Sequence, residues 1–449
     1  MKEKIVVTGM GAVTPVGVGA DRYWENLTAG KCGIDRISSF DAGELAVQIA
    51  AEVRDFVPED YLPGKLIRET DAFTQYAFAA AQEALVDAGV ADTGAADSGT
   101  GSISSIAGIA PERFGIVMGT AMSGIDTIAA TQEILTNAVH KNVGPRFVPR
   151  ILGNIAASQI AIAYGMTGPS YTISTACASG GDAIGMSAML LLSGEADMML
   201  AAGADSTLCP LVIYSLANAQ ALSRENDNPQ AACRPFDASA RGFVMGEGGG
   251  ALILETESHA KARGAKIYAE LAGWANTNDA WHVTKPMDGG RQSAVCMHKA
   301  LAKAGMTPAE IDYVNAHGTG TLKGDTAEAQ AMAAVFGGAS GEAGPAGGAA
   351  GPADGAAHPA IGSTGPAISS TKAATGHMMG GGGITEAIAC IKAIETGTLP
   401  PTLNLSDPVA DLDFVAQTRT EQRIDAAMSN AFGFGGQNST IIFRRYLPL

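Results

Sequence analysis

The chain has 449 residues, 46% of them hydrophobic and only 16% charged, and this composition excludes a chain that is disordered throughout. Its formal net charge of −16, from 29 lysines and arginines against 45 aspartates and glutamates, speaks against a nucleic-acid-binding surface, because phosphates are bound by basic faces. The six cysteines include no C-x-x-C pair, so neither a zinc site nor a disulfide framework is predicted, and a reducing cytoplasm fits best.

Short apolar runs rich in β-forming residues recur along the chain, and each is followed by a glycine-rich turn and then a segment rich in alanine and leucine. The runs occupy 4–8, 114–119, 171–175, 198–202, 313–316 and 368–371. Buried strands that alternate with helical segments indicate an α/β protein. At about 150 residues per domain, the length allows two or three domains or two closely packed halves.

The N-terminal run is predicted to be a strand. Glycine, threonine and proline follow it directly, so we expect no signal peptide. The segment 8–13 (TGMGAV) resembles a dinucleotide-binding fingerprint only in part, because the third glycine is missing and Pro15 interrupts the expected helix. A glycine turn at the end of a strand is the more ordinary interpretation.

Further along, 71–88 carries apolar residues at helical spacing, and Gly89 stands where a helix-ending glycine belongs, so a helix is predicted there. Two stretches rich in glycine and alanine, 93–110 and 337–366, break the pattern and are predicted to be surface loops. The second is interpreted as an insert within a domain, because a strand run resumes directly after it. The longest apolar stretch, 183–192, has about half the length of a membrane span, so no span is expected.

The strongest single signal is Cys177, which stands between the β-rich run at 171–175 and the apolar helical run at 183–192. This order predicts that the thiol lies on a turn from strand to helix, at a helix N-terminus. Free backbone N–H groups and the helix dipole there favour a thiolate and could also hold an oxyanion. A buried cysteine that only packs is an equally good interpretation of this segment by itself.

Two histidines occur in similar surroundings. His317 follows an apolar strand run and leads into a Gly/Thr turn, whereas His377 follows 369–376 and precedes the glycines of 380–383. Two imidazoles and one thiol, each at a strand-end loop, indicate nucleophilic catalysis with polar assistance. For each histidine taken separately, a structural role is the default.

Two further features accompany these residues. Lys372 lies five residues before His377 and could pair with Glu386 behind the imidazole, although a solvent-exposed lysine is the simpler expectation. The segment 430–438 (NAFGFGGQN) combines two phenylalanines with glycines that permit unusual backbone angles. Such a loop could place an N–H group at a reacting carbonyl, or it could be an ordinary hairpin turn.

Taken together, these motifs resemble the elongating, type II β-ketoacyl-[acyl carrier protein] synthases of the thiolase-fold superfamily. The resemblance spans almost the whole chain, in the order 6–11 (VVTGMG), 174–179 (STACAS), 234–237 (RPFD), 241–243 (RGF), 317–321 (HGTGT), 372–377 (KAATGH) and 432–436 (FGFGG). The tract at 337–366 is longer and richer in Gly, Ala and Pro than the family pattern, and it leaves these motifs intact.

The resemblance implies a five-layered αβαβα thiolase fold built from two similar halves, 1–265 and 266–449. It implies that Cys177 is the nucleophile that accepts an acyl group from an acyl carrier protein. It also implies that His317 and His377 assist the decarboxylation of malonyl carrier and stabilise the enolate. Two histidines at these positions point away from the initiating synthases, which carry one His and one Asn.

Residues around the acyl group gain roles only through the resemblance. The backbone N–H groups of Cys177 and Phe434 match the family's oxyanion hole. Phe434 also matches the gate of the acyl pocket, and Met122 matches a residue near the end of that pocket at the dimer interface.

The resemblance also assigns residues around the carrier's arm. Thr319 and Thr321 match the threonines that hydrogen-bond phosphopantetheine, while Lys372 and Glu386 match a supporting polar pair. No metal and no organic cofactor is implied, because the phosphopantetheine belongs to the carrier.

An acidic carrier protein requires a basic docking patch despite the net charge of −16. Lys65 and Arg68 match two docking positions of the family, and Lys141 matches a third. Glu69 and Glu225 stand where the family often has basic residues, so a carrier with a different charge pattern is an alternative. The resemblance further implies a homodimer, or a heterodimer with a paralogous chain-length factor.

The predicted reaction is the decarboxylative condensation of an acyl group on Cys177 with malonyl carrier, which gives β-ketoacyl carrier and CO₂ in fatty-acid elongation. A ketosynthase of a type II polyketide or polyene pathway has the same triad and is the alternative. Cys177 disfavours a non-catalytic chain-length factor, and the lack of a cysteine in 432–436 disfavours a thiolase. A cysteine hydrolase would leave the second histidine and Lys372 without a role.

Overall fold

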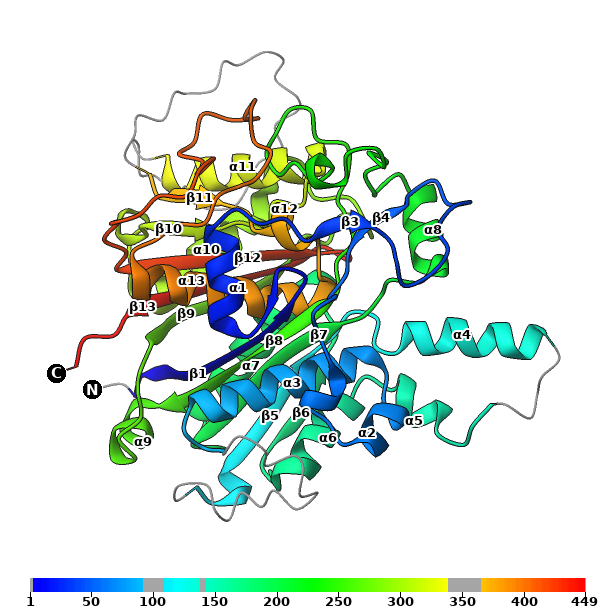
Figure 1. Ribbon diagram of the computed structural model, residues 1–449. Coiled ribbons are helices and arrows are strands. Elements are labelled where there is room, and N and C mark those ends of the chain that lie inside the picture. The colour runs from blue at the N-terminus through cyan, green and yellow to red at the C-terminus, as the bar shows by residue number, and fades with distance from the viewer. Residues whose placement is uncertain (1–2, 92–108, 138–142, 338–364, 449) are drawn as a thin grey trace.

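The structure is a computed structural model that describes residues 3–91, 109–137, 143–337 and 365–448 (Figure 1). Its strands form two similar arrays. The first array contains β1 (Ile5–Thr14), β5 (Phe114–Gly119), β6 (Ser170–Ile173), β7 (Met198–Asp205) and β8 (Gly248–Thr256). The second contains β9 (Ala269–Asn278), β10 (Tyr313–Asn315), β11 (Ala367–Ser369), β12 (Ala426–Gly433) and β13 (Gln437–Arg445).

The two arrays have the same topology. The strand order is β6-β5-β7-β8-β1 in the first and β11-β10-β12-β13-β9 in the second. In each array the first three strands of that order are parallel, and the last two are antiparallel to their neighbours. Antiparallel pairing of β1 with the start of β9 joins the arrays edge to edge. The sequence shows no repeat, so this internal duplication is visible only in the topology.

The helices cover and separate these arrays. They are α1 (Ala20–Thr28), α2 (Gly64–Glu69), α3 (Ala72–Asp87), α4 (Ile125–Thr136), α5 (Phe147–Ile151), α6 (Ile155–Tyr164), α7 (Ser179–Leu192), α8 (Pro210–Asn218), α9 (Glu257–Ala262), α10 (Arg291–Ala304), α11 (Leu322–Phe336), α12 (Lys372–Thr375) and α13 (Gly382–Thr396). The remaining short strands are β2 (Gly17–Val18), which pairs with β1, and β3 (Ile34–Arg36) with β4 (Ile49–Ala51), which pair with each other.

Five layers result from the packing of these helices (Figure 1). Helix α3 covers the outer face of β1, β7 and β8, while α10 packs on β9 and β13 and is itself flanked by α11. Helices α7 and α13 contact each other and lie between the arrays, α7 on β5 and β7, and α13 on β8 and β12. The predicted five-layered αβαβα architecture is thus confirmed. The division near Ala265 remains a prediction; it falls between the last strand of one array and the first strand of the other.

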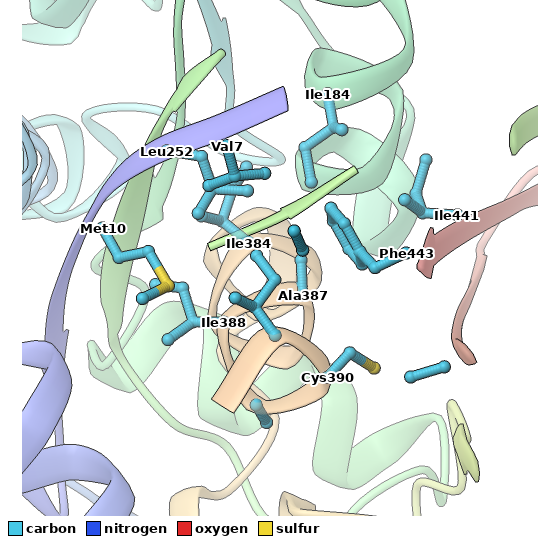
Figure 2. Packing of buried hydrophobic residues seen from close by; sticks show 14 of the residues in the cluster. Val7, Met10, Ile184, Leu252, Ile384, Ala387, Ile388, Cys390, Ile441 and Phe443 are labelled. Carbon is cyan, nitrogen blue, oxygen red and sulfur yellow. The ribbon is translucent and has the colours of Figure 1, made fainter. Parts of the chain in front are cut away.

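Helix α13 of the central layer is buried on every side and is mostly apolar. All residues of α13 from Gly382 to Ile394 are buried, as expected for a helix that packs between two sheets. Figure 2 shows Ile384 and Ala387 of this helix among side chains of both arrays. Close packing also needs small residues, since a Cβ on Gly180 of α7 would lie 2.7 Å from the carbonyl oxygen of Gly380. Within the described ranges, no helix is long and apolar enough to cross a membrane.

The predicted local elements agree with the structure. Each of the six β-rich runs lies in a strand, with ends that differ by a few residues, and the helix predicted at 71–88 is α3. The side chain of Asp71 accepts a hydrogen bond from the Phe73 backbone N–H at the start of α3, and Gly89 has a φ of 67° just beyond its end. Strands β8, β9, β12 and β13 are not among the predicted runs. The loops predicted at 93–110 and 337–366 lie almost wholly outside the described residues.

Candidate active site

Cys177 lies on a short turn that connects β6 to α7. Residues Ala176–Ala178 form one 3₁₀ turn, and α7 begins at the next residue. Ala176 has a φ of 52°, a strained backbone angle for a residue with a side chain, which turns the chain sharply before the thiol. The prediction of a cysteine between a strand and a helix is confirmed, and its side chain is 7% exposed.

The Cys177 thiol lies close to both histidines. His377 Nε2 lies 3.0 Å from Cys177 Sγ, and the rings of His317 and His377 are 5.3 Å apart and nearly perpendicular. The Cys177 sulfur and one ring nitrogen of each histidine lie within 4.8 Å of one another. Such a set of soft donors is also the one that could coordinate a metal ion. Three groups from loops far apart in the sequence therefore converge on one point.

Buried carboxylates fix the backbone turn that carries His317. Glu328 accepts hydrogen bonds from the backbone N–H groups of His317, at 2.8 Å, and Gly318, at 2.7 Å. Asp325 accepts from the N–H groups of Thr319 and Gly320. Burial raises the pKa of both carboxyl groups to about 7, and the backbone donors oppose that rise. Sequence analysis missed both acids, although their spacing of three residues places them on one face of α11.

Thr319 and Thr321 lie on the same turn as His317. Their hydroxyl oxygens are 2.9 Å apart, so one hydroxyl donates to the other. Thr319 is buried and Thr321 is half-buried. Both hydroxyls therefore belong to the turn that carries His317, whose side chain is itself half-buried.

Lys372 forms a buried ion pair with Glu386. Both side chains are nearly inaccessible, 2% and 3% exposed, and Nζ donates to Oε1. The expected pairing is thus confirmed, and the simpler expectation of a solvent-exposed lysine is wrong. Burial followed by the positive charge of Lys372 lowers the pKa of His317 and of His377 well below the usual range. Both imidazoles are therefore neutral near pH 7.

The thiol of Cys177 is protonated for a related reason. Burial raises its pKa to about 11, and the opposing effects of Lys372 and of the Phe434 and Cys177 N–H groups do not cancel that rise. The sequence-based expectation of a favoured thiolate is wrong, because removal from water outweighs the turn's backbone dipoles. Attack by sulfur therefore requires a proton acceptor, and His377 Nε2 is the ring nitrogen in contact with the thiol.

The turn of the hairpin formed by β12 and β13 lies beside Cys177. It carries Phe434, which is 39% exposed, and the Phe434 backbone N–H interacts with the Cys177 thiol. Gly433 allows this approach, since a Cβ there would lie 2.7 Å from the Thr175 carbonyl oxygen and 3.0 Å from the Cys177 nitrogen. Segment 430–438 is both an ordinary hairpin and a donor of an N–H group at the thiol, so the two interpretations of the sequence are compatible.

Met122 lies on the loop between β5 and α4 and is half-buried against the apolar cluster that contains Cys177. Asp205 orders this loop, because its carboxylate accepts from the N–H groups of Ala121, Met122 and Gly380. The aspartate thereby connects the Met122 loop with the loop that follows His377. Asp205 ends a strand without any motif around it, and no sequence signal marks it.

The predicted docking residues are only partly described. Lys65 and Arg68 are exposed on α2, and neither has an ion-pair partner among the described residues. Glu69 on the same helix pairs with Arg146. The third position, Lys141, lies outside the described residues.

Comparison with protein families and known proteins gives consistent matches. Residues 2–260 match the family model described as beta-ketoacyl synthase, N-terminal domain, and residues 268–406 match that of the C-terminal domain. The chain is 37% identical over 446 residues to 3-oxoacyl-[acyl-carrier-protein] synthase 2 of Coxiella burnetii, and 38% identical over 447 residues to the protein of that name from Vibrio cholerae. Each alignment covers 99% of both chains.

Solved structures are similar over the same length. The ishigamide ketosynthase/chain length factor matches with a TM-score of 0.84 and 30% identity over 100% of both chains. A type II polyketide ketosynthase in complex with its acyl carrier protein matches with a TM-score of 0.82 and 31% identity, also over 100% of both chains. A beta-ketoacyl synthase from Burkholderia phymatum has a TM-score of 0.84 and 32% identity, covering 99% of this chain and all of that one.

Proposed function

The chain belongs to the β-ketoacyl synthase family, and from this premise we propose that it extends acyl chains by condensing acyl carrier with malonyl carrier, using Cys177, His317 and His377. It is an acyl-transferring condensing enzyme of the fatty-acid elongation type, and several of its full-length relatives are named 3-oxoacyl-[acyl-carrier-protein] synthase 2. The observation that supports the assigned residues best is the convergence of one thiol and two neutral imidazoles, with His377 in contact with the thiol and His317 within 4.8 Å.

The first half-reaction is acyl transfer to Cys177. The sulfur attacks the carbonyl carbon of the acyl thioester while His377 takes the thiol proton. The N–H groups of Cys177 and Phe434 donate to the oxygen that becomes negative. The C–S bond to the pantetheine breaks, and its sulfur leaves with the proton returned by His377. The products are acyl-Cys177 and free carrier thiol.

The second half-reaction is condensation. The malonyl C–C bond breaks, CO₂ departs, and the electron pair forms an enolate whose oxygen accepts hydrogen bonds from His317 and His377. A neutral imidazole donates through the ring nitrogen that carries its proton, so His377 donates here in the tautomer protonated at Nε2, and the lowered pKa of each ring keeps it neutral. The enolate carbon attacks the carbonyl carbon of acyl-Cys177, the C–S bond breaks, and the sulfur leaves as a thiolate that takes up one proton from solvent. Because decarboxylation supplies the electron pair, we propose that no resident metal or organic cofactor is needed.

A second pathway remains a specific candidate. Two of the structurally similar proteins are a ketosynthase/chain length factor and a type II polyketide ketosynthase, at 30% and 31% identity. The same three residues would perform the same condensation in such a pathway. The difference would lie in the acyl chain and in the second subunit.

The function is tested by offering malonyl carrier together with saturated, monounsaturated, β-keto and polyene acyl carriers. We expect a single two-carbon extension of saturated and monounsaturated chains, measured by mass spectrometry of the carrier-bound products. Activity confined to β-keto or polyene chains, or dependent on an added paralogous subunit, would instead assign the protein to the polyketide or polyene pathway.

We propose that the chain functions as a dimer through the edge strand β6. Tyr171 on this strand is 54% exposed and Ile162 on α6 is 74% exposed. Further exposed apolar side chains lie on α4, α5 and α7 or directly after α5, namely Ile128, Leu135, Val148, Leu152, Met189 and Leu192. An apolar surface beside an open sheet edge is typical of an interface between subunits. A second copy or a paralogous chain-length factor would cover it.

The basic residues of α2 are proposed to bind the carrier. The double variant Lys65→Glu/Arg68→Glu is expected to weaken carrier binding about tenfold at low salt, because it reverses an exposed positive patch. The difference should shrink as salt is raised, and titration calorimetry at several salt concentrations measures it. The control Lys261→Glu/Arg423→Glu makes the same change in net charge at exposed positions on other elements. Equal affinities of the two double variants at low salt would remove α2 from the docking surface.

The cysteines fit a cytoplasmic protein, which is the location we propose. All six are free, and five of them are buried. Free thiols persist where the surroundings are reducing.

A further inference from the structure

A small polar recess opens beside the turn that carries Thr319 and Thr321. It has a volume of about 200 Å³ and is lined by Glu225, Ala232, Arg234, Ser239 and Arg241. The backbone joins it directly to the threonine turn, because the Gly242 N–H donates to the Gly320 carbonyl oxygen at 3.0 Å. A Cβ on Gly320 would lie only 3.2 Å from the backbone nitrogen of Arg234. The recess and the two hydroxyls are therefore parts of one surface.

The two arginines of this recess have no carboxylate partner in the part of the chain that the structure describes. Arg234 donates to the Ala231 carbonyl oxygen at 2.8 Å and to Ser239 Oγ at 3.4 Å, and Arg241 donates to the Ala240 carbonyl oxygen at 3.1 Å. Among the described residues, no carboxylate oxygen lies within ion-pair distance of either guanidinium. Each guanidinium has five N–H donors, so most of them remain available. Two such groups beside one recess favour a bound anion.

We propose that this recess binds the phosphodiester of the carrier's phosphopantetheine arm. The inference rests on the proposed function, since it names where the substrate of that reaction is held. The phosphate is the charged group of the arm, and the guanidinium groups of Arg234 and Arg241 can each donate paired hydrogen bonds to its oxygens. From the recess the arm passes Thr319 and Thr321 and reaches Cys177 with its thioester. Holding the phosphate fixes how far the arm extends into the site.

Glu225 lowers the positive charge of the recess. Its exposed carboxylate is part of the lining without pairing with either arginine. A negative charge near a phosphodiester opposes binding, so Glu225 weakens the hold on the arm. The neighbouring Arg224 points elsewhere, because it donates to the Ala217 carbonyl oxygen and does not line the recess. This arginine provides a matched control.

The test compares two small acyl donors that differ only by the phosphate, acyl-4′-phosphopantetheine and acyl-pantetheine. The measured quantity is the ratio of their kcat/KM values for acylation of Cys177. We expect the phosphorylated donor to be preferred, and Arg234→Gln or Arg241→Gln to lower that ratio about tenfold or more. Glu225→Gln should raise the ratio, and Arg224→Gln should leave it unchanged. A ratio that both recess variants leave unchanged would overturn the proposal.

Two further measurements identify the source of the phosphate and separate this inference from the proposed function. Arg241→Gln should lower kcat/KM for acyl carrier by a similar factor. If it impairs only coenzyme A thioesters, the recess serves their diphosphate and the carrier proposal fails. If neither small donor nor acyl carrier acylates Cys177, the proposed function itself fails. Acylation without any preference for phosphate contradicts only the recess.

Discussion

The Cys177→Ala variant is expected to form no acyl-enzyme and to lose condensation by at least about 1,000-fold. The reason is that the proposed mechanism holds the acyl group on this sulfur between the two half-reactions. Alanine removes the sulfur and leaves the turn of Ala176–Ala178 and the flanking helix α7 in place. Intact-protein mass spectrometry after incubation with acyl carrier measures the first loss, and carrier-bound product measures the second.

A matched control distinguishes chemistry from stability. Cys296→Ala removes another buried thiol, on α10, whose sulfur contacts the Ala275 carbonyl oxygen outside the site. We expect this variant to acylate and condense at nearly the normal rate, and both variants to keep similar melting temperatures. Persistent acylation of Cys177→Ala at another residue would show that the nucleophile has been misassigned.

The His317→Ala variant should separate the two half-reactions. In the proposed mechanism His317 donates to the enolate oxygen, while His377 is the ring in direct contact with the thiol. Loss of one preorganised donor to a developing oxyanion costs about 100-fold or more in rate. We therefore expect His317→Ala to acylate Cys177 at nearly the normal rate and to lose malonyl-dependent condensation by about that factor.

The His377→Ala variant provides the comparison. It removes both the second enolate donor and the proton acceptor of a thiol whose pKa is about 11. Acylation should therefore slow as well, in contrast to His317→Ala. Rapid-mixing mass spectrometry of the acyl-enzyme and release of labelled CO₂ measure the two steps. Equal loss of both steps in both variants would contradict this division of roles.

The buried Lys372–Glu386 pair explains why the histidines can act in this way. A charge removed from water is costly unless it is paired, and the ion pair satisfies that condition. Its position then sets the protonation of its neighbours, because Lys372 adds to the effect of burial on the pKa of each imidazole. The positive charge of Lys372 thus helps to keep both imidazoles neutral at a distance. Among the described residues, Lys372 donates no hydrogen bond to either ring.

The sequence by itself determined many of the local elements and the candidates for the reacting groups. The run 114–119 coincides with β5, and the segment 71–88 is α3 with its cap at Asp71 and its terminating glycine at 89. Both are set by short-range rules, namely a continuous run of apolar residues for the buried strand, and apolar spacing, capping and backbone freedom at glycine for the helix, which act within a few residues. The order of the motifs around Cys177 and His317 was sufficient to predict the family.

Only the tertiary structure decided how these groups behave. Cys177 and His377 are 200 residues apart and meet because two topologically similar arrays enclose α7 and α13. Burial raises the pKa of the Cys177 thiol, so the thiol is protonated where a thiolate was expected. Lys372 is buried and paired with Glu386, whereas the simplest expectation from sequence was an exposed side chain. Asp205 carries no local signal, and the spacing of Asp325 and Glu328 on one helix face does not say which backbone groups they bind. Desolvation and long-range contacts depend on the whole folded chain, so no short segment of sequence encodes them.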